Sequence, residues 1–386
     1  MSIKIQLKVF VNSDIAHLVW QIEKRIPHLL GFAVEKRTLN EHNKVTNEEC
    51  LKSWIGFPGR ASNDSKIPPR SSRQEKVGEH RPTTQWPIQE FQWNDHTCLY
   101  DERVSYRVIP VIGTTPEDLK PNMAGASDWS TPQILNGRLT SGACFEAYFN
   151  RGIVASQWLN ILLHKMNAKH PASALDKSMT DSKPSTVHRY QLIADPSDHT
   201  RKYLGGGLRH AMLDLLTQVH KSAGMMVYLC LYELDDPELI DYLQKLGKKA
   251  HVLLANGTHT PEEPDENARS RQKLRSSGVN VYDRIITASG VLAHNKFVVF
   301  TEGDKATMAW TGSTNWTKSG LCTQCNNGLL VRDERLASIY LAEWHHLKSL
   351  EGETGKDLRK FNKALSEKAS ITVQEPGSGP VTIQQW

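Results

Sequence analysis

The feature that most limits the fold is a regular alternation of helical and strand-like segments that begins at Tyr203. The helical segments repeat apolar residues every three or four positions, whereas the strand-like segments are short apolar runs. Such runs suit strands that are covered on both faces. The alternation therefore predicts an α/β fold with a mixed or mostly parallel sheet flanked by helices. The expected helices are 208–221, one starting at 235–238, 265–277 and one starting at Asp333, and the expected strands are 225–232, 249–255, 279–282 and one from Ala293.

The first 125 residues have a different pattern. Apolar and polar residues alternate at 3–9, 18–22, 32–34 and 104–108, and turns rich in proline, glycine and asparagine separate these runs. Strands at this spacing predict a small antiparallel β-sandwich, and their order resembles that of fibronectin type III domains. The tract 58–84, dense in serine, proline and basic residues, is expected to be a solvated, disordered excursion between strands.

The stretch from Ala293 to Phe300 is predicted to be a strand, because its apolar residues are mostly valine and phenylalanine and show no helical period. Side chains alternate between the two faces of a strand, so His294 and Lys296 are expected side by side on one face. A neutral imidazole beside a fixed cation suits attack on an anionic phosphorus. The imidazole supplies the lone pair, and the ammonium holds a non-bridging oxygen.

A second strand, predicted from Ala306 to Trp310, leads into Gly312. A backbone turn at this glycine would present Ser313 and Asn315 as further hydrogen-bond donors. Their two side chains and the pair on the preceding strand would then meet at one end of the sheet, which predicts an active site there.

His-x-Lys followed by Gly-Ser-x-Asn resembles the signature of the phospholipase D superfamily, and the resemblance covers roughly residues 201–350. It implies cleavage of phosphodiesters without a metal or another cofactor. It also implies that His294 is the nucleophile or general acid and that Lys296 and Asn315 donate to phosphate oxygens. Ser313 would then position the substrate through a hydrogen bond.

The sequence departs from the family pattern at two acidic positions. The usual acid lies seven residues after the histidine, where this chain has Thr301, and Asp304 is a possible replacement on a longer hairpin. A glutamate often follows the Gly-Ser-x-Asn turn in relatives, and the nearest match here is Asn327. Asp304 and Asn327 are therefore the possible orienting residues for the histidine.

Three other motifs favour ordinary structural roles. His42-Asn43-Lys44 repeats the tripeptide, but it lies in a polar run and predicts a solvated turn between two strands. Gly205-Gly206-Gly207 lacks a full phosphate-loop pattern and predicts a flexible entry to a helix. Cys322 and Cys325 have the spacing of a zinc knuckle, yet no second pair is present, so free thiols are favoured over a metal site.

The proposed chemistry needs two histidines, because one attacks phosphorus and the other protonates the departing alkoxide. The pairs at 164–165 and 220–221 are adjacent residues on predicted helices and lack the spacing. Either two chains meet as a homodimer, which we expect, or a second motif half is missing from this chain. Residues 381–386 alternate like the start of a new strand, which is consistent with a second half.

Together these patterns predict a domain order. A sandwich domain at 1–125 precedes a connecting region at 126–200, which holds a strand at 145–149 and a helix at 156–166. The phospholipase D-like catalytic domain occupies 201–350. A C-terminal tail occupies 351–386, and the alternative of a second half would begin in this tail.

Composition is that of an ordinary globular protein, with 386 residues of which 39% are hydrophobic and 23% charged, enough for two or three domains. The net charge of +5 mildly favours any polyanion, so it does not choose between nucleic acid and an anionic membrane. No apolar run approaches the length of a bilayer span and no signal peptide is visible, so a cytoplasmic protein is expected.

Three functions are consistent with the sequence. We expect a phosphodiester hydrolase that acts through a phosphohistidine, with a phospholipid as the favoured substrate. A nuclease of the same superfamily is the first alternative. A non-catalytic protein that binds phosphate or a partner with a degraded motif is the second, and the threonine and asparagine at the two acidic positions support it.

Overall fold

The computed structural model describes residues 5–54, 56, 80–115, 117–136, 144–152, 192–258, 264–286, 291–350, 360–361, 363–364, 370–375 and 379–384. These residues fall into two compact units, one that ends at Asn136 and one that starts at Cys144. The helix predicted at 156–166, the pair at 164–165 and most of the tract 58–84 lie outside the described residues.

The first unit is all-β, as predicted. One sheet has the order β1-β2-β7 and a second has the order β10-β8-β3-β4, with β9 paired to β8, and every pairing in them is antiparallel. Alternating residues such as Leu18, Val34 and Val108 are fully buried in one hydrophobic cluster. The elements are β1 (Ile5–Val11), β2 (Ala16–Ile22), β3 (Leu29–Leu39), β4 (Val45–Cys50), β5 (Lys52–Ser53), β6 (Arg81–Pro82), β7 (Gln92–Asp95), β8 (Arg103–Ile112), β9 (Lys120–Pro121), η1 (Met123–Gly125) and β10 (Gln133–Ile134).

The tripeptide His42-Asn43-Lys44 lies in the turn between β3 and β4, and its side chains are exposed. Asn43 has a φ of 59°, a conformation that asparagine adopts more readily than most residues. The prediction of a solvated turn is confirmed.

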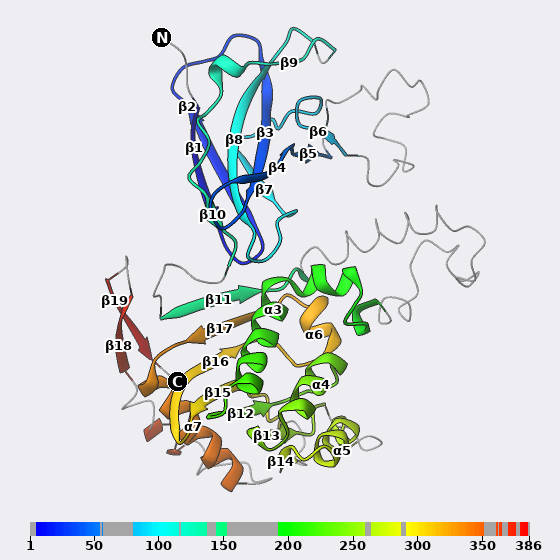
Figure 1. Ribbon diagram of the computed structural model, residues 1–386, viewed down its shortest axis with the longest axis vertical. Coiled ribbons are helices and arrows are strands. Elements are labelled where there is room, and N and C mark those ends of the chain that lie inside the picture. The colour runs from blue at the N-terminus through cyan, green and yellow to red at the C-terminus, as the bar shows by residue number, and fades with distance from the viewer. Residues whose placement is uncertain are drawn as a thin grey trace, which may run out of the picture. The chain divides into compact units, whose positions relative to one another are not determined.

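The second unit is built on a seven-stranded sheet with the order β11-β17-β16-β15-β12-β13-β14 (Figure 1). The strands are β11 (Phe145–Phe149), β12 (Met225–Leu231), β13 (Ala250–Ala255), β14 (Asn280–Arg284), β15 (Lys296–Glu302), β16 (Lys305–Gly312) and β17 (Asn327–Val331). The pairs β12/β13 and β13/β14 are parallel and the other four are antiparallel. The α/β class and the mixed sheet are confirmed, but a mostly parallel sheet is wrong. A two-residue turn joins β15 to β16, so the chain returns antiparallel where no helix intervenes.

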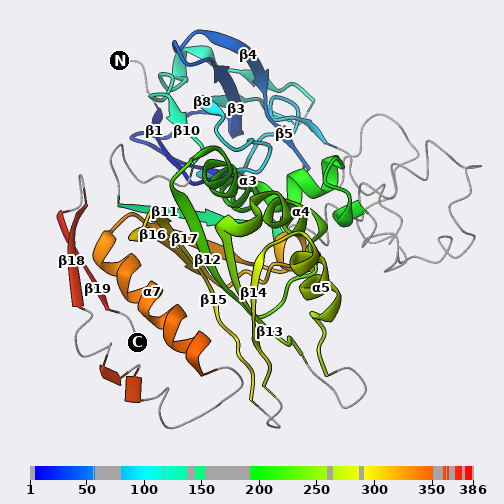
Figure 2. The ribbon, with the colours of Figure 1, turned by 60° about the horizontal axis from the view of Figure 1, so that its bottom comes forward.

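Helices cover both faces of this sheet (Figure 2). Phe297, Val299 and Ala309 pack against one helix, α7, whereas Val298 and Phe300 face α3 on the other side. Phe297 to Phe300 alternate between the two faces along β15, as a strand buried on both faces requires. The helical elements are α3 (His199–Lys221), α4 (Pro237–Leu246), η3 (Gly247–Lys249), α5 (Ala268–Ser276), α6 (Lys318–Cys322) and α7 (Glu334–Ser349).

The three glycines lie inside α3 and divide it. Gly206 has a φ of 50° and a ψ of −148°, so the helical geometry is interrupted there and resumes toward Lys221. The predicted helix from residue 208 is therefore the second part of α3, and a first part from His199 precedes it. No sequence signal predicted this first part.

The C-terminal segment folds back onto the same unit. β18 (Ser370–Glu375) and β19 (Gly379–Gln384) form an antiparallel hairpin beside α7 (Figure 2). Ile371 and Val373 are buried against Val331 and Leu336. The strand predicted at 381–386 thus exists at 379–384, and its Val381 and Ile383 pack against the hydrophobic core of this unit.

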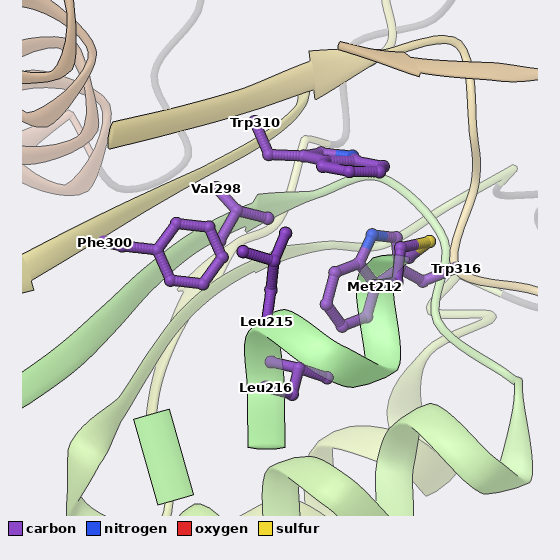
Figure 3. A pocket seen from close by; sticks show the side chains of 7 residues that line it. All are labelled: Met212, Leu215, Leu216, Val298, Phe300, Trp310 and Trp316. Carbon is purple, nitrogen blue, oxygen red and sulfur yellow. The ribbon is translucent and has the colours of Figure 1, made fainter. Parts of the chain in front are cut away.

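A small apolar cavity lies between α3 and the sheet (Figure 3). Its volume is about 10 Å³, which is barely enough for one water molecule and far too small for a substrate. Its walls are Met212, Leu215, Leu216, Val298, Phe300, Trp310 and Trp316. We interpret this cavity as imperfect core packing.

Among the described residues, no helix is long and apolar enough to cross a membrane.

Candidate active site

Three chain segments meet at one edge of the seven-stranded sheet. β12 ends there, β15 begins there, and β16 ends there in the Gly-Ser-x-Asn turn. Backbone hydrogen bonds join the segment after β12 to the turn after β16. Trp316 N donates to Glu233 O at 3.2 Å, and Asp235 N donates to Trp316 O at 3.1 Å. The turn is therefore fixed to the segment that follows β12.

The side chains of His294 and Lys296 lie next to each other on one aromatic ring. The His294 ring meets the buried Tyr232 ring edge to face, with 4.5 Å between centroids, and Lys296 Nζ lies 4.9 Å from the same ring centre. Lys296 Nζ also donates to the His294 carbonyl oxygen at 3.2 Å. Lys296 is the first residue of β15, so His294 lies just before the strand and is exposed rather than within it.

Asn315, in the turn after β16, contacts an acid that the sequence did not point to. Asn315 Nδ2 donates to Glu233 Oε2 at 2.6 Å. Asn315 Oδ1 is buried and has no hydrogen-bond partner among the described residues. The negative charge of Glu233 also raises the pKa of Lys296.

Ser313 and Asn327 hold each other in the turn. Ser313 N donates to Asn327 Oδ1 at 3.1 Å, and Asn327 N donates to Ser313 Oγ at 3.0 Å. Ser313 Oγ in turn donates to Asn326 Oδ1 at 2.9 Å. Asn327, predicted as a possible orienting residue for the histidine, therefore acts on the turn. Ser313 shapes the turn and keeps an exposed hydroxyl.

The close approach at Gly312 leads to a first prediction. A Cβ at this position would lie 2.4 Å from Asn327 O, a backbone atom that cannot swing away, and the φ of Gly312 is 155°. We expect Gly312→Ala to displace the turn, to lower the free energy of unfolding by about 1–3 kcal/mol and to reduce turnover. Urea unfolding and steady-state kinetics would check this. Gly303→Ala is the control, because a Cβ there meets nothing within 4 Å, so that only its φ of 57° adds strain. Equal turnover in the two variants would contradict the expectation.

Asp304, the other possible orienting residue, is not brought to the site. It lies in the turn between β15 and β16, at the end of β15 opposite to Lys296, and is exposed. A strand advances about 3.3 Å per residue, so the length of β15 separates Asp304 from the site. Thr301, which occupies the usual acidic position, is 1% exposed and its Oγ1 has no partner among the described residues. Neither position supplies a carboxylate to His294.

The electrostatics of the site keep its groups in different protonation states. Burial and the charge of Lys296 lower the pKa of His294, so the imidazole is neutral at pH 7. Burial lowers the pKa of Lys296 to about 8, against the opposing effect of Glu233. Burial and the negative charge of Glu266 raise the pKa of Glu233, although Lys296 lowers it. A neutral imidazole thus stands beside a mostly charged ammonium at neutral pH.

The sequence did not identify Glu233 as a site residue, although its position after a buried strand was a signal. It comes two residues after β12, an inner strand of the sheet, and a carboxylate directly after such a strand lies at the sheet edge where sites form. The sequence does not show that the end of β12 and the start of β15 lie at the same edge of the sheet. This follows only from the antiparallel pairing of the two strands.

The two cysteines near the turn differ in burial. Cys322 is buried, which raises the pKa of its thiol to about 12, and Cys325 is exposed. Within the described ranges, no three His, Cys, Asp or Glu side chains gather in a way that would hold a metal ion. Cys322 and Cys325 do not form a disulfide.

Comparison with known proteins gives a family for the second unit. Residues 216–348 match the family model described as "Cardiolipin synthase, PLD-like domain". No curated protein sequence is significantly similar to this chain.

Several solved structures are similar to parts of the chain. The phospholipase D family member Nuc from Salmonella typhimurium has 19% identity over 37% of this chain and 90% of its own, with a TM-score of 0.28. NucT from Helicobacter pylori has 15% identity over 36% of this chain and 88% of its own, with a TM-score of 0.27. Polyphosphate kinase from Porphyromonas gingivalis has 9% identity over 95% of this chain and 57% of its own, with a TM-score of 0.31. The family-model match assigns residues 216–348 to the phospholipase D superfamily.

Proposed function

We propose that the chain is a phosphodiester hydrolase that works without a metal ion and through a phosphohistidine. The observation that carries this proposal is the contact of His294 and Lys296 with one Tyr232 ring, at the end of the sheet where the turn that carries Asn315 also begins. An exposed neutral imidazole can attack, and an ammonium and an amide N–H can stabilise the charge that develops on phosphate oxygens.

In the first step a ring nitrogen of His294 attacks phosphorus. The new P–N bond forms as the bond from phosphorus to the leaving oxygen breaks, and a second imidazolium gives its proton to that oxygen. In the second step the second imidazole takes a proton from water, the water oxygen attacks phosphorus, and the P–N bond breaks. Lys296 and Asn315 donate to the non-bridging oxygens throughout. The products are the alcohol and a phosphate monoester.

The second histidine is supplied by a second copy of the chain in this proposal. The described residues contain one His-x-Lys that is followed by the Gly-Ser-x-Asn turn, and the pair at 220–221 is exposed at the end of α3. A homodimer would bring two sets together. The cytoplasmic location expected from the sequence is part of the same proposal.

Two observations favour a phospholipid over a nucleic acid. Val291 and Leu292 immediately precede the site and are exposed, by 38% and 50%, which suits an apolar acyl chain or lipid surface. The carboxylates of Glu233 and Glu266 lie close enough to interact, which disfavours a polyanion and suits a zwitterionic head group. A nuclease remains the alternative, since both substrates present the same phosphodiester.

The test is an assay of EDTA-treated protein against phosphatidylcholine vesicles and plasmid DNA side by side. We expect release of the head group from the vesicles without added metal and little cleavage of DNA. Cleavage of DNA with a steep salt dependence would instead identify a nuclease. No turnover of either substrate, together with no phosphate trapped on His294 from an aryl phosphodiester, would favour the non-catalytic binding protein.

The pKa values predict a bell-shaped dependence of kcat/KM on pH. The acidic limb reflects protonation of His294 at a pH below the usual histidine value, because the nucleophile must be neutral. The alkaline limb combines two losses: Lys296 loses, near pH 8, the proton with which it binds phosphate, and the second imidazolium loses the proton that it must give to the leaving oxygen. Arginine stays charged at all accessible pH values, so Lys296→Arg should move the alkaline limb upward even if the rate falls. An unchanged limb in this variant would show that another group titrates.

A further inference from the structure

Glu233 connects the two halves of the motif. Its Oε2 accepts from Asn315 Nδ2 at 2.6 Å, and its charge raises the pKa of Lys296 against the effect of burial. Asn315 comes from the turn after β16 and Lys296 from the start of β15, so one half-buried carboxylate acts on both phosphate-binding groups.

The carboxylate fixes which end of the Asn315 amide faces the site. A carboxylate accepts hydrogen bonds and does not donate them, so the NH₂ end of the amide must point toward Glu233. The Asn315 nitrogen carries two hydrogens, and one remains for a phosphate oxygen. Since Asn315 Oδ1 has no partner among the described residues, the Glu233 contact is what sets the orientation of the amide there.

The backbone around Glu233 is held firmly enough for this role. Glu233 O accepts from Trp316 N at 3.2 Å. The next residue, Leu234, donates its N–H to Asn267 Oδ1 at 2.9 Å, and Asn267 is 1% exposed. The carboxylate is therefore presented from a fixed strand end, as a positioning group must be.

We propose that Glu233 is the acidic positioning residue of this site, which orients the Asn315 amide and balances the charge of Lys296. The phospholipase D pattern has acids at the positions of Thr301 and Asn327, and this chain has none there. Glu233, two residues after β12, supplies a carboxylate instead. This inference rests on the proposed function, since it assigns Glu233 a task in phosphodiester binding and turnover.

The test compares Glu233→Gln, Glu233→Asp and the control Asp304→Asn, which removes an acid from the far end of β15. Glu233→Gln keeps the shape but loses the charge, and its amide can present either end to Asn315. We expect kcat/KM to fall by about 10- to 100-fold, with the alkaline limb of the pH profile shifted to lower pH. Glu233→Asp should restore the position of the limb, and Asp304→Asn should match the wild type. A loss in Glu233→Gln that is equal at every pH would indicate a purely structural role and overturn the proposal.

A second measurement does not depend on turnover. The lysines are ¹³C-methylated, Lys296 is assigned by the signal that Lys296→Arg lacks, and its titration is followed by NMR. We expect the pKa of Lys296 to fall in Glu233→Gln and to stay unchanged in Asp304→Asn. An unchanged titration in Glu233→Gln would overturn the proposal even if the wild type hydrolyses phosphodiesters. If the wild type shows no turnover but the titration shifts, the proposed function fails and the link from Glu233 to Lys296 stands.

Discussion

Replacing His294 by alanine is expected to reduce phosphodiester turnover by about 10⁴-fold or more, to the background rate. The imidazole is the one exposed nucleophile that lies beside both Lys296 and the Tyr232 ring in the described part of the site. Without it, the P–N bond cannot form. The fold should survive, because His294 precedes β15 and is exposed, and substitutions at such positions usually change stability by less than about 0.5 kcal/mol.

The chain provides a matched control for this variant. His42 belongs to the same tripeptide sequence, His-Asn-Lys, but lies exposed in the turn between β3 and β4. His42→Ala should retain full turnover. Circular dichroism would establish that both variants are folded, and a labelled aryl phosphodiester would show trapped phosphate in the wild type and His42→Ala but not in His294→Ala. Turnover by His294→Ala at the wild-type rate would remove this residue from the mechanism.

The local part of the site could be predicted from the sequence because it depends on short-range geometry. His294 and Lys296 are two residues apart, so even an extended segment outside the strand brings them to one side. Gly312 precedes Ser313 and Asn315 directly, and the turn follows from that spacing. The exact start of β15 could not be predicted, because the end of a strand depends on its neighbour, here β12.

The acidic partner could not be predicted, because it depends on long-range pairing. Asp304 is near His294 in sequence, but β15 continues to Glu302 before the chain turns, which carries Asp304 to the opposite sheet edge. Glu233 is remote in sequence, yet the antiparallel pairing of β12 with β15 and the bridge from Leu234 to Trp316 bring it to the site. Proximity along the chain therefore favoured an acid that the fold carries away from the site.

The same limit applies to the sheet. Buried apolar runs show that strands are covered on both faces, but they carry no information on direction. The parallel pairs β12/β13 and β13/β14 follow the predicted strand–helix–strand units, with α4 and α5 between the strands. β15, β16 and β17 lack such a full-length intervening helix and run antiparallel.

The largest effect on stability is expected from Arg201→Met, which should lower the free energy of unfolding by about 3–5 kcal/mol. Arg201 in α3 is completely buried, and its guanidinium donates to Asp236 Oδ1 at 2.8 Å, to Glu238 Oε2 at 2.8 Å and to the Ile193 carbonyl at 2.6 Å. Burial alone would lower the pKa of Arg201, but these carboxylates raise it, so the charge persists. Methionine would fill the volume and leave the acids without a cation, apart from the contact of Glu238 with Arg209.

The control for this variant is Lys245→Met on α4. Lys245 forms an ion pair with Asp241 at 2.6 Å, but the two side chains are 58% and 57% exposed, so the loss should be below about 1 kcal/mol. Hydrogen exchange of the α3 and α4 amides in increasing urea measures the stability of this unit separately from that of the β-sandwich. Equal exchange in the two variants would mean that the buried charges contribute no more than a surface pair.

The buried cluster also connects stability to the active site. Asp236 caps α4 through Glu238 N and Leu239 N, and its own N–H donates to Trp316 O at 3.1 Å. When Arg201 is lost, the Asp236 carboxylate is buried without a cation, and moving toward water lowers its free energy. This movement would displace the neighbouring segment that carries Glu233. Arg201→Met should therefore lose turnover well below its unfolding temperature, whereas Lys245→Met should not. Wild-type turnover in folded Arg201→Met would show that the cluster stabilises the helices without positioning the site.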